Sequence, residues 1–421
     1  MGMAVLLTFL NLAIEHSGFG HRLGWYATEE ILRWSRSTSD SVVVVDVTDI
    51  PVTHRDVGPP VTSREALLAL VKGLKSAGAV ALGLDVDLSP EEEPLHPEDA
   101  RFLESLLAVR EEGHAGVPYP IFVGVHRGIG KGPAGWLGSL SFKELAAHLL
   151  VQRSRVPAAP TWVLPSDAEE PLWGLGPALV RARVGALPVD SGQGWFRSAN
   201  VAEHPEPGAP ISAFMLLDTS GLGQLVERRI RLSPGDTEPG ACARFLESPA
   251  QADRVRGKIV LVGAADPDDE RDNSFFVPGE VQPYPGVYMH ACAVTTLLDG
   301  YLYEVTPLGR LAADLTLALF VFGGIALVHM AYLRLRRAPP APLALFLVLL
   351  CTSVCLAGIG GLVGIARFRI VWDGFAYVWL AAALHLLLEA ARHARSTARS
   401  RLPLAALAEA EGTLLPNEEN P

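Results

Sequence analysis

The sequence predicts an α/β domain, with a mostly parallel open sheet flanked by helices, followed by an all-α bundle of transmembrane helices. Two observations carry this prediction. Over about the first 300 residues, short β-branched runs alternate with helical segments, as in open α/β sheets. In the last third of the 421-residue chain, three apolar runs approach or exceed the roughly 20 residues that a helix needs to cross a hydrocarbon core.

The first βαβ unit is predicted over residues 41–86. Residues 41–47 read SVVVVDV, a continuous β-branched run that is typical of a buried parallel strand. Residues 62–79 follow with helical periodicity, and residues 80–86 form the next strand. Strand, helix and strand within about 45 residues indicate a right-handed crossover between parallel strands.

The helix over residues 62–79 has signals at both ends. Thr62 and Glu65 have the spacing of a capping box, and Gly78 is suited to the position that follows a helix. Four apolar residues recur at helical spacing and define the face expected to be buried: Leu67, Leu70, Val71 and Leu74.

The remaining elements of the domain are predicted in the same way. The clearest are a helix over 100–109, strands over Ile121–Val125 and 258–263, and a helix over Gly286–Leu298. The stretch 128–240 is rich in Gly and Pro and its pattern is weaker. There we expect a strand at 184–189 and another at 211–217, the second with a helix as the alternative.

The three apolar runs cover residues 315–333, 343–366 and 370–388. Arginines follow the first and third runs in clusters, whereas the loop after the second run contains only Arg367 and Arg369. Basic residues stay on the cytoplasmic side of a membrane. We therefore expect the first run to exit inward, the second to return and the third to exit inward again, with the preceding domain outside the cytoplasm.

The amino-terminal run over residues 3–14 is apolar but only 12 residues long, which is too short to span a bilayer. We interpret residues 1–16 as the truncated back half of a first transmembrane helix, with an interfacial or core helix as the alternative. The expected domains are then an extracytoplasmic domain over 17–310, three transmembrane helices over 311–390 and a short cytoplasmic tail over 391–421.

Charge and cysteine content narrow the class of protein. The net charge is −11 although the carboxyl-terminal region is rich in Arg, so the large domain is acidic. An acidic domain argues against nucleic acid as a partner, because phosphate binding needs Lys and Arg. Cys242 and Cys292 could form one disulfide in an oxidising compartment, or they could be two buried free thiols.

Acidic residues follow the predicted strands and form the candidate site. Asp46 and Asp49 follow the first strand, Asp85 and Asp87 close the second, and Asp266 follows the late one. Ligands of open α/β sheets bind beyond the carboxyl ends of the strands. Converging carboxylates suit a divalent cation, for which Asp46 and Asp85 are the best candidates, or an amine-bearing ligand. The alternative is that these acids cap helices or turns and are otherwise solvated.

One histidine and the lack of catalytic motifs complete the candidate chemistry. His290 lies on the last predicted helix of the domain, where it could bind a ligand, report pH or simply be packed and hydrogen-bonded. The sequence has no G-x-S-x-G elbow and no Cys/His spacing of a metal site. We therefore expect no enzyme activity and no cofactor other than the possible divalent cation.

Five stretches resemble the CHASE2 extracytoplasmic sensor domain followed by its three transmembrane helices. They are VVVVDVTDI (42–50), LVKGLKSAGAVALGLDVDLS (70–89), GKIVLVGAAD (257–266), PGVYMHACAVTTLLDGYL (285–302) and, more weakly, VGALPVDSGQGWFRSAN (184–200). The resemblance implies an external receiver domain coupled to a cytoplasmic effector. Here only 33 residues follow residue 388, too few for an enzyme domain, so we expect a separate effector protein as the partner.

The function expected from these observations is that of a sensor in the cytoplasmic membrane. Its external domain would bind a small molecule or an envelope component, and its helices, embedded in the lipid bilayer, would pass the signal inward. A homo-oligomer is compatible with this arrangement. The alternative is a membrane-anchored scaffold that binds other proteins and has no small-molecule ligand.

Overall fold

A computed structural model describes most of the domain that precedes the three apolar runs. The residues that the structure describes are 40–54, 61–86, 96–113, 116–125, 142, 144–151, 157–164, 171–187, 196–198, 214–232, 239–241, 248–266, 273–277, 283–306 and a few between 308 and 371. The chain divides into two compact units, and nearly all described residues belong to the unit formed by Thr28–Thr306 and Leu362–Val371. The predicted domain boundaries stay predictions.

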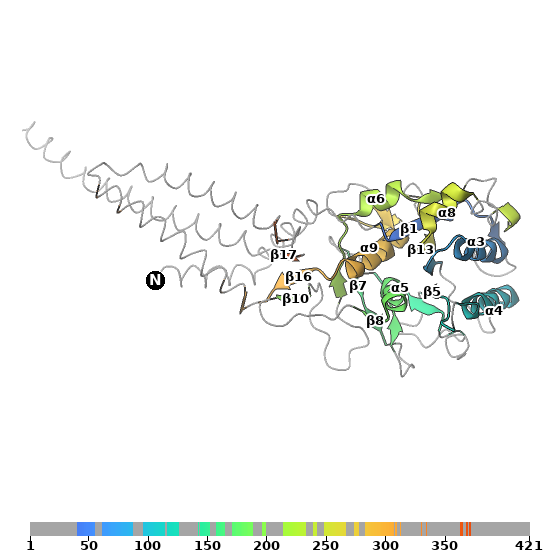
Figure 1. Ribbon diagram of the computed structural model, residues 1–421, viewed down its shortest axis with the longest axis horizontal. Helices are drawn as coiled ribbons and strands as arrows, with labels where there is room; N and C mark the ends of the chain where they lie inside the picture. The colour runs from blue at the N-terminus through green and yellow to red at the C-terminus, as the bar shows by residue number, and fades with distance from the viewer. Residues whose placement is uncertain are drawn as a thin grey trace, which may run out of the picture. The chain divides into compact units, whose positions relative to one another are not determined.

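The centre of this unit is a six-stranded sheet in which all pairings are parallel. This confirms the predicted open α/β sheet. The strand order is β12-β1-β13-β4-β5-β6; Figure 1 labels β1, β13 and β5 of this sheet. The bounds of these strands are β1 Val42–Asp46, β4 Ala81–Asp85, β5 Ile121–Val125, β6 Ala146–His148, β12 Ile230–Arg231 and β13 Ile259–Gly263.

The late strand β13 lies between β1 and β4, the two strands of the predicted βαβ unit. Each of its five residues is in register with a residue of both neighbours, so that Gly263 lies between Asp46 and Asp85. The crossover from β1 to β4 therefore passes over an intervening strand. The spatial order follows from this long-range insertion and not from the order along the chain.

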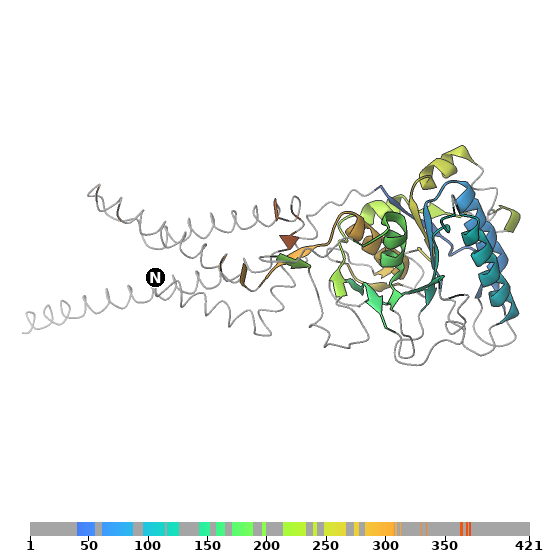
Figure 2. The ribbon, with the colours of Figure 1, turned by 60° about the horizontal axis from the view of Figure 1, so that its bottom comes forward.

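Helices cover both faces of the sheet, as Figure 2 shows from the side. One face carries α3 (Arg64–Ser76), α4 (Pro97–Glu111) and α8 (Pro249–Val255), and the other carries α5 (Leu175–Val184), α6 (Leu222–Glu227) and α9 (Gly286–Leu298). The helices that connect β1 to β4, β4 to β5 and β12 to β13 lie on the face with α3. The chain between β6 and β12 contributes α5 and α6 to the opposite face. This division is what a single hand of crossover requires.

The valine run of β1 fills both cores at once. Val43 and Val45 pack into the core with α3 and α4, whereas Val42 and Val44 pack into the core with α5 and α9. Successive side chains of a strand point to opposite faces, so a strand covered on both sides is apolar throughout. Each fully buried valine contributes about 1.5–3 kcal/mol relative to an exposed one.

Most predicted elements are confirmed, with one shifted cap. The strand Ile121–Val125 and the helix Gly286–Leu298 have the predicted bounds. The cap of α3 is Ser63, whose side chain accepts a hydrogen bond from the Ala66 N–H at 3.3 Å, so its assignment to Thr62 was wrong by one residue. Gly78, with φ of 93°, follows the helix as predicted.

The region rich in Gly and Pro holds the main error. The strand predicted at 184–189 is wrong, because Val184 is the last residue of α5 and Gly185 follows it in the left-handed conformation. Pro177 concealed this helix in the sequence, yet it lies in the first turn, where its missing N–H would have had no intrahelical partner. At 211–217 the strand alternative is confirmed by β11 (Phe214–Leu216), which pairs with β7 (Ala158–Pro160).

A small three-stranded sheet lies beyond α9. Its central strand β16 (Tyr303–Val305) pairs antiparallel with β10 (Phe196–Ser198) and parallel with β17 (Ile370–Val371) (Figure 1). The third apolar run thus begins with two residues in a strand. The other short strands are β2 Val52–Thr53, β3 Val61–Thr62, β8 Trp162–Val163, β9 Leu172–Trp173, β14 Asn273–Phe275 and β15 Tyr284–Pro285.

The predicted transmembrane bundle stays a prediction. The N-terminal apolar run and almost all of the three later runs lie outside the described residues. Within the part of the chain that the structure describes, no helix has the combined length and apolar composition needed to cross a membrane.

Gly176 permits the close packing of α5 on α9. A Cβ at this position would lie 2.7 Å from Ala293 Cβ and 3.2 Å from the His290 carbonyl oxygen, neither of which can rotate away. We expect Gly176→Ala to lower the free energy of unfolding by about 1–3 kcal/mol. Urea denaturation of both proteins measures this change.

The matched control is Gly223→Ala in α6, where a Cβ would meet nothing within 4 Å. We expect this variant to be more stable by about 0.4–1 kcal/mol, because alanine restricts the unfolded chain. Equal effects of the two substitutions would contradict the packing seen between α5 and α9.

Candidate functional site

The candidate site lies where the carboxyl ends of β1, β13 and β4 meet. β1 and β4 lead to helices on one face of the sheet, whereas β13 leads to α9 on the other face. Such a change of direction between neighbouring strands is the usual location of ligand sites in open α/β sheets. Asp46 and Asp85 end β1 and β4, and both are in register with Gly263 at the end of β13.

Strand alternation directs both carboxylates toward α9. Val45 and Leu84, the preceding residues, pack on the opposite face with α3 and α4, so Asp46 and Asp85 point the other way. Gly263 between them has no side chain, and a Cβ there would lie 3.0 Å from Val287 Cγ2 on α9. The first turn of α9 therefore separates two acidic positions.

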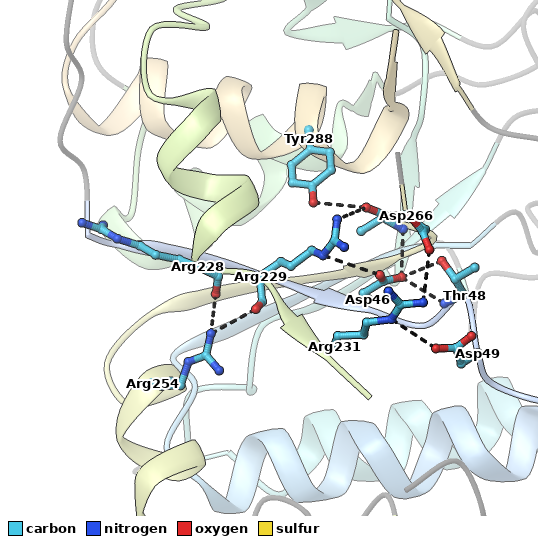
Figure 3. A network of polar contacts seen from close by, with 10 residues as sticks. Asp46, Thr48, Asp49, Arg228, Arg229, Arg231, Arg254, Asp266 and Tyr288 are labelled. Carbon is cyan, nitrogen blue, oxygen red and sulfur yellow. Dashed lines mark hydrogen bonds and ion pairs between the residues drawn. The ribbon is translucent and has the colours of Figure 1, made fainter. Parts of the chain in front are cut away.

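Asp46 is the most buried acid of the site, with 2% of its surface exposed. Its Oδ1 atom accepts three hydrogen bonds, from Thr48 Oγ1 at 2.6 Å, Thr48 N at 3.0 Å and Ala265 N at 3.1 Å (Figure 3). Its Oδ2 atom is buried and has no hydrogen-bond partner among the described residues. The Arg229 Nε atom is 4.0 Å from Oδ2, which is an ion-pair distance but too long for a hydrogen bond.

The peptide of Ala265 is held from two sides. Asp46 accepts from its N–H, while its carbonyl oxygen accepts from Tyr288 Oη at 3.1 Å and Arg229 Nη1 at 3.3 Å (Figure 3). Burial raises the pKa of Tyr288 to about 12, so the phenol is a neutral donor at physiological pH. Tyr288 belongs to α9, so this contact joins the helix to the loop after β13.

Arg231 forms ion pairs with both loops that follow β1 and β13. Its Nε atom lies 3.3 Å from Asp49 Oδ2 and its Nη2 atom 3.2 Å from Asp266 Oδ2 (Figure 3). The hydrogen bond and charge of Asp49, followed by the charge of Asp266, raise the pKa of Arg231. Half of this side chain is exposed, at 51%, and solvent-exposed ion pairs contribute little to stability.

The structure thus brings together three predicted residues, Asp46, Asp49 and Asp266, and adds two arginines that the prediction missed. The missed signal is the alternation in residues 229–232, where arginines alternate with the buried residues Ile230 and Leu232. Among the described residues, no group of three or more His, Cys, Asp or Glu side chains could hold a metal ion. A divalent cation at Asp46 and Asp85 stays a prediction.

Asp85 lies with His290 in a second cluster on the other side of Val287. His290 is 4% exposed, and its Nε2 atom is 3.9 Å from Asp85 Oδ1. His148, at the end of β6, is 1% exposed, and its Nδ1 atom accepts from Leu150 N at 3.3 Å. Burial, with a smaller effect of the nearby His290, lowers the pKa of His148 to about 3. Asp87 lies outside the described residues.

A comparison with protein families shows where this fold belongs. The CHASE2 domain matches residues 3–328, which cover the whole sheet and both acidic clusters. The chain belongs to the CHASE2 family. CHASE2 domains are extracytoplasmic sensor domains of membrane proteins, and a sensor role is consistent with the match. No curated protein and no solved structure matches the chain.

Cys292 of this CHASE2 domain is a free thiol in the core. It lies on α9, is fully buried, and burial raises its pKa. Of the two alternatives for Cys242 and Cys292, the structure therefore has the free thiol at position 292. Cys242 lies outside the described residues.

The CHASE2 domain also has a groove of about 350 Å³ between the first turns of α3 and α4. Arg64 lines this groove and forms an ion pair with Asp99; both side chains are buried, and Arg64 Nε lies 2.7 Å from Asp99 Oδ1. Arg64 also lies over the Phe102 ring, 6.0 Å from its centre. The buried charge of Arg64 is therefore compensated by Asp99, and this ion pair joins α3 to α4 beside the groove.

His148 makes the stability of the domain depend on pH. The pKa is about 3 in the folded state and about 6.5 in the unfolded chain, so the unfolded chain binds more protons between these values. Its contribution is present above pH 6.5 and is lost progressively as the pH falls. We expect about 2 kcal/mol of loss from this residue between pH 6.5 and 5.

The measurement is urea denaturation of the wild type and His148→Asn at pH 7, 6 and 5. Asparagine can still accept from Leu150 N but does not titrate, so the variant should lose stability less steeply. His54→Asn, at an exposed position, should keep the wild-type slope. Identical slopes for His148→Asn and wild type would show that His148 is not buried as described.

Cys292 should be inert in the folded protein. A maleimide reagent is expected to leave it unmodified under native conditions and to modify it in denaturant, because the buried thiol is neither accessible nor ionised. Peptide mass spectrometry distinguishes it from the other cysteines. Rapid native labelling at position 292 would contradict its burial on α9.

Proposed function

We propose that this protein is a membrane-anchored extracytoplasmic sensor. Its CHASE2 domain would bind a small molecule or envelope component at the carboxyl edge of the sheet and pass a shift through α9 to the apolar runs. The observation that carries this proposal is the pairing of β16 with β17. It joins the end of the domain to the first two residues of the third apolar run.

The helix α9 connects the candidate site to this pairing. Tyr288 contacts the Asp46 network, and His290 lies near Asp85 in the other cluster. After α9, Gly300 turns the chain with φ of 95°, Tyr301 and Leu302 are buried, and β16 follows at once. A displacement of α9 at the site would therefore reach β16 within a short, packed segment.

The pairing of β17 also supports the predicted topology. Tyr303 is in register with Ile370, and Glu304 with Val371. Two strands can pair only on the same side of a membrane. The charge pattern predicted that the loop with Arg367 and Arg369 lies on the same side as the domain, and this pairing agrees with that prediction.

Signalling requires two states that the ligand binds unequally. The output would pass to a separate effector protein, and a homo-oligomer could take part in the change. The alternative, a scaffold without a small-molecule ligand, predicts a stable complex with envelope proteins and no response to any ligand at the carboxyl edge.

The β16–β17 pairing can be tested by a disulfide. Glu304 and Val371 are opposite each other in adjacent strands, and such neighbours are within the Cα separation of about 4.4–6.8 Å that a disulfide needs. We expect Glu304→Cys/Val371→Cys to give a disulfide-linked peptide, detected by mass spectrometry, after mild oxidation of the full chain. Each single variant serves as a control, and no linked peptide in the double variant would contradict the pairing.

The membrane sidedness has a separate test. A membrane-impermeant maleimide added to intact cells should label Val371→Cys, and a second variant, Asp253→Cys on the exposed surface of α8, should be labelled as well. The proposal fails if both positions react only after the cells are permeabilised.

A further inference from the structure

We propose that the ligand of this sensor carries a primary ammonium group that binds the Oδ2 atom of Asp46. This inference rests on the proposed function, because it names the chemistry that the carboxyl edge recognises. The site consists of Asp46, the two arginines Arg229 and Arg231, and the carboxylates of Asp49 and Asp266.

The proposed ligand contact is Asp46 Oδ2, a buried oxygen with no hydrogen-bond partner among the described residues. Three donors converge on Asp46 Oδ1, whereas Oδ2 of the same carboxylate is buried and receives none from the described residues. A buried carboxylate oxygen without a donor costs more than an ordinary missing hydrogen bond. Arg229 does not supply the missing bond, because its Nη1 atom donates to the Ala265 carbonyl and its Nε atom stays 4.0 Å from Oδ2.

The charge of the network favours a cation. Three carboxylates, from Asp46, Asp49 and Asp266, face two guanidinium groups, from Arg229 and Arg231. Within this set the acids outnumber the arginines by one, because Asp49 and Asp266 share Arg231. An ammonium group brings one positive charge and up to three donors, which matches one open carboxylate oxygen.

Other ligand classes fit less well. Calcium takes six to eight oxygen ligands and magnesium needs near-octahedral geometry, while the oxygens of Asp49 and Asp266 nearest the network already face Arg231. The Arg229 guanidinium beside Oδ2 would repel a divalent cation about twice as strongly as an ammonium group at the same distance. An anion would meet the carboxylate of Asp46 directly.

In this proposal the ligand reaches Asp46 past the half-exposed side chain of Arg231. Arg231 joins the loop after β1 to the loop after β13 near the buried Asp46 (Figure 3), and its side chain is 51% exposed. Exposed ion pairs open at little cost. Breaking the ion pairs of Arg231 with Asp49 and Asp266 would release from each other the two loops whose polar groups surround Asp46.

Binding at Oδ2 would be transmitted to α9. An ammonium group there would compete with Arg229 for Asp46, and Arg229 shares the Ala265 carbonyl with Tyr288. A shift of Arg229 therefore changes the contact that holds the first turn of α9 against the loop after β13. Two hydrogen bonds thus link the ligand site to α9: one from Arg229 to the Ala265 carbonyl oxygen, and one from Tyr288 of α9 to the same oxygen.

The test uses ethylammonium chloride as the probe and the full-length protein in lipid nanodiscs. We expect ethylammonium at tens of millimolar to raise the melting temperature by about 2–4 °C. Tetramethylammonium, a cation without N–H donors, and potassium at equal ionic strength should give no rise. Asp46→Asn should abolish the response, while Asp253→Asn, at an exposed acid paired with Arg256, should keep it.

A second variant covers the case in which Asp46→Asn does not fold. Arg231→Gln removes the ion pairs with Asp49 and Asp266 and leaves the site more negative. This variant should therefore bind ethylammonium about two- to fivefold more tightly, as measured by a titration of the melting temperature. Equal shifts with ethylammonium and tetramethylammonium, a response only to Mg²⁺ or Ca²⁺, or no shift in wild type would each overturn the proposal.

The two proposals can fail separately. If ethylammonium has no effect but positions 253 and 371 are labelled from outside, the sensor proposal stands and the ammonium site is wrong. If ethylammonium acts through Asp46 but both positions are reached only in permeabilised cells, the site stands and the extracytoplasmic assignment is wrong.

Discussion

The chemistry of this domain depends on the position of β13 in the middle of the sheet. Because β13 lies between β1 and β4, its exit loop must pass between the ends of two strands that both close with an aspartate. Asp46 uses this proximity to hold the Ala265 peptide, and Val287 of α9 covers Gly263 between the two acids. Without the inserted strand, neither the division into two clusters nor the contact with α9 would exist.

Charge balance explains why the carboxyl edge can hold so many acids. A buried carboxylate is costly unless hydrogen bonds and opposite charges compensate it. Backbone and hydroxyl donors satisfy one oxygen of Asp46, and β12 brings Arg229 and Arg231 beside the acids of two loops. The compensation is uneven, since the half-buried Asp49 and Asp266 share Arg231 while the buried Asp46 keeps an oxygen without a donor among the described residues.

The sequence was sufficient for local structure and insufficient for long-range placement. The valine run of β1 and the helix Gly286–Leu298 could be predicted because burial on both faces and helical periodicity act within a short segment. The insertion of β13 and the arrival of Arg229 and Arg231 beside Asp46 depend on pairings between residues 178 to 217 positions apart, which no local pattern encodes. The helix α5 was missed for a local reason, because Gly176 and Pro177 in its first turn obscured its period.

The helix α9 is held against the candidate site by contacts of its first turn. Its first turn has no side-chain cap, so its position is set by the Tyr288 bond to Ala265, by Val287 over Gly263 and by the tight contact with Gly176 of α5. It is buried along almost its whole length, and packed interiors transmit strain because they have few voids to absorb it. In the proposed sensor, a change in either acidic cluster would therefore move α9 as a whole, and β16 is the next element along the chain.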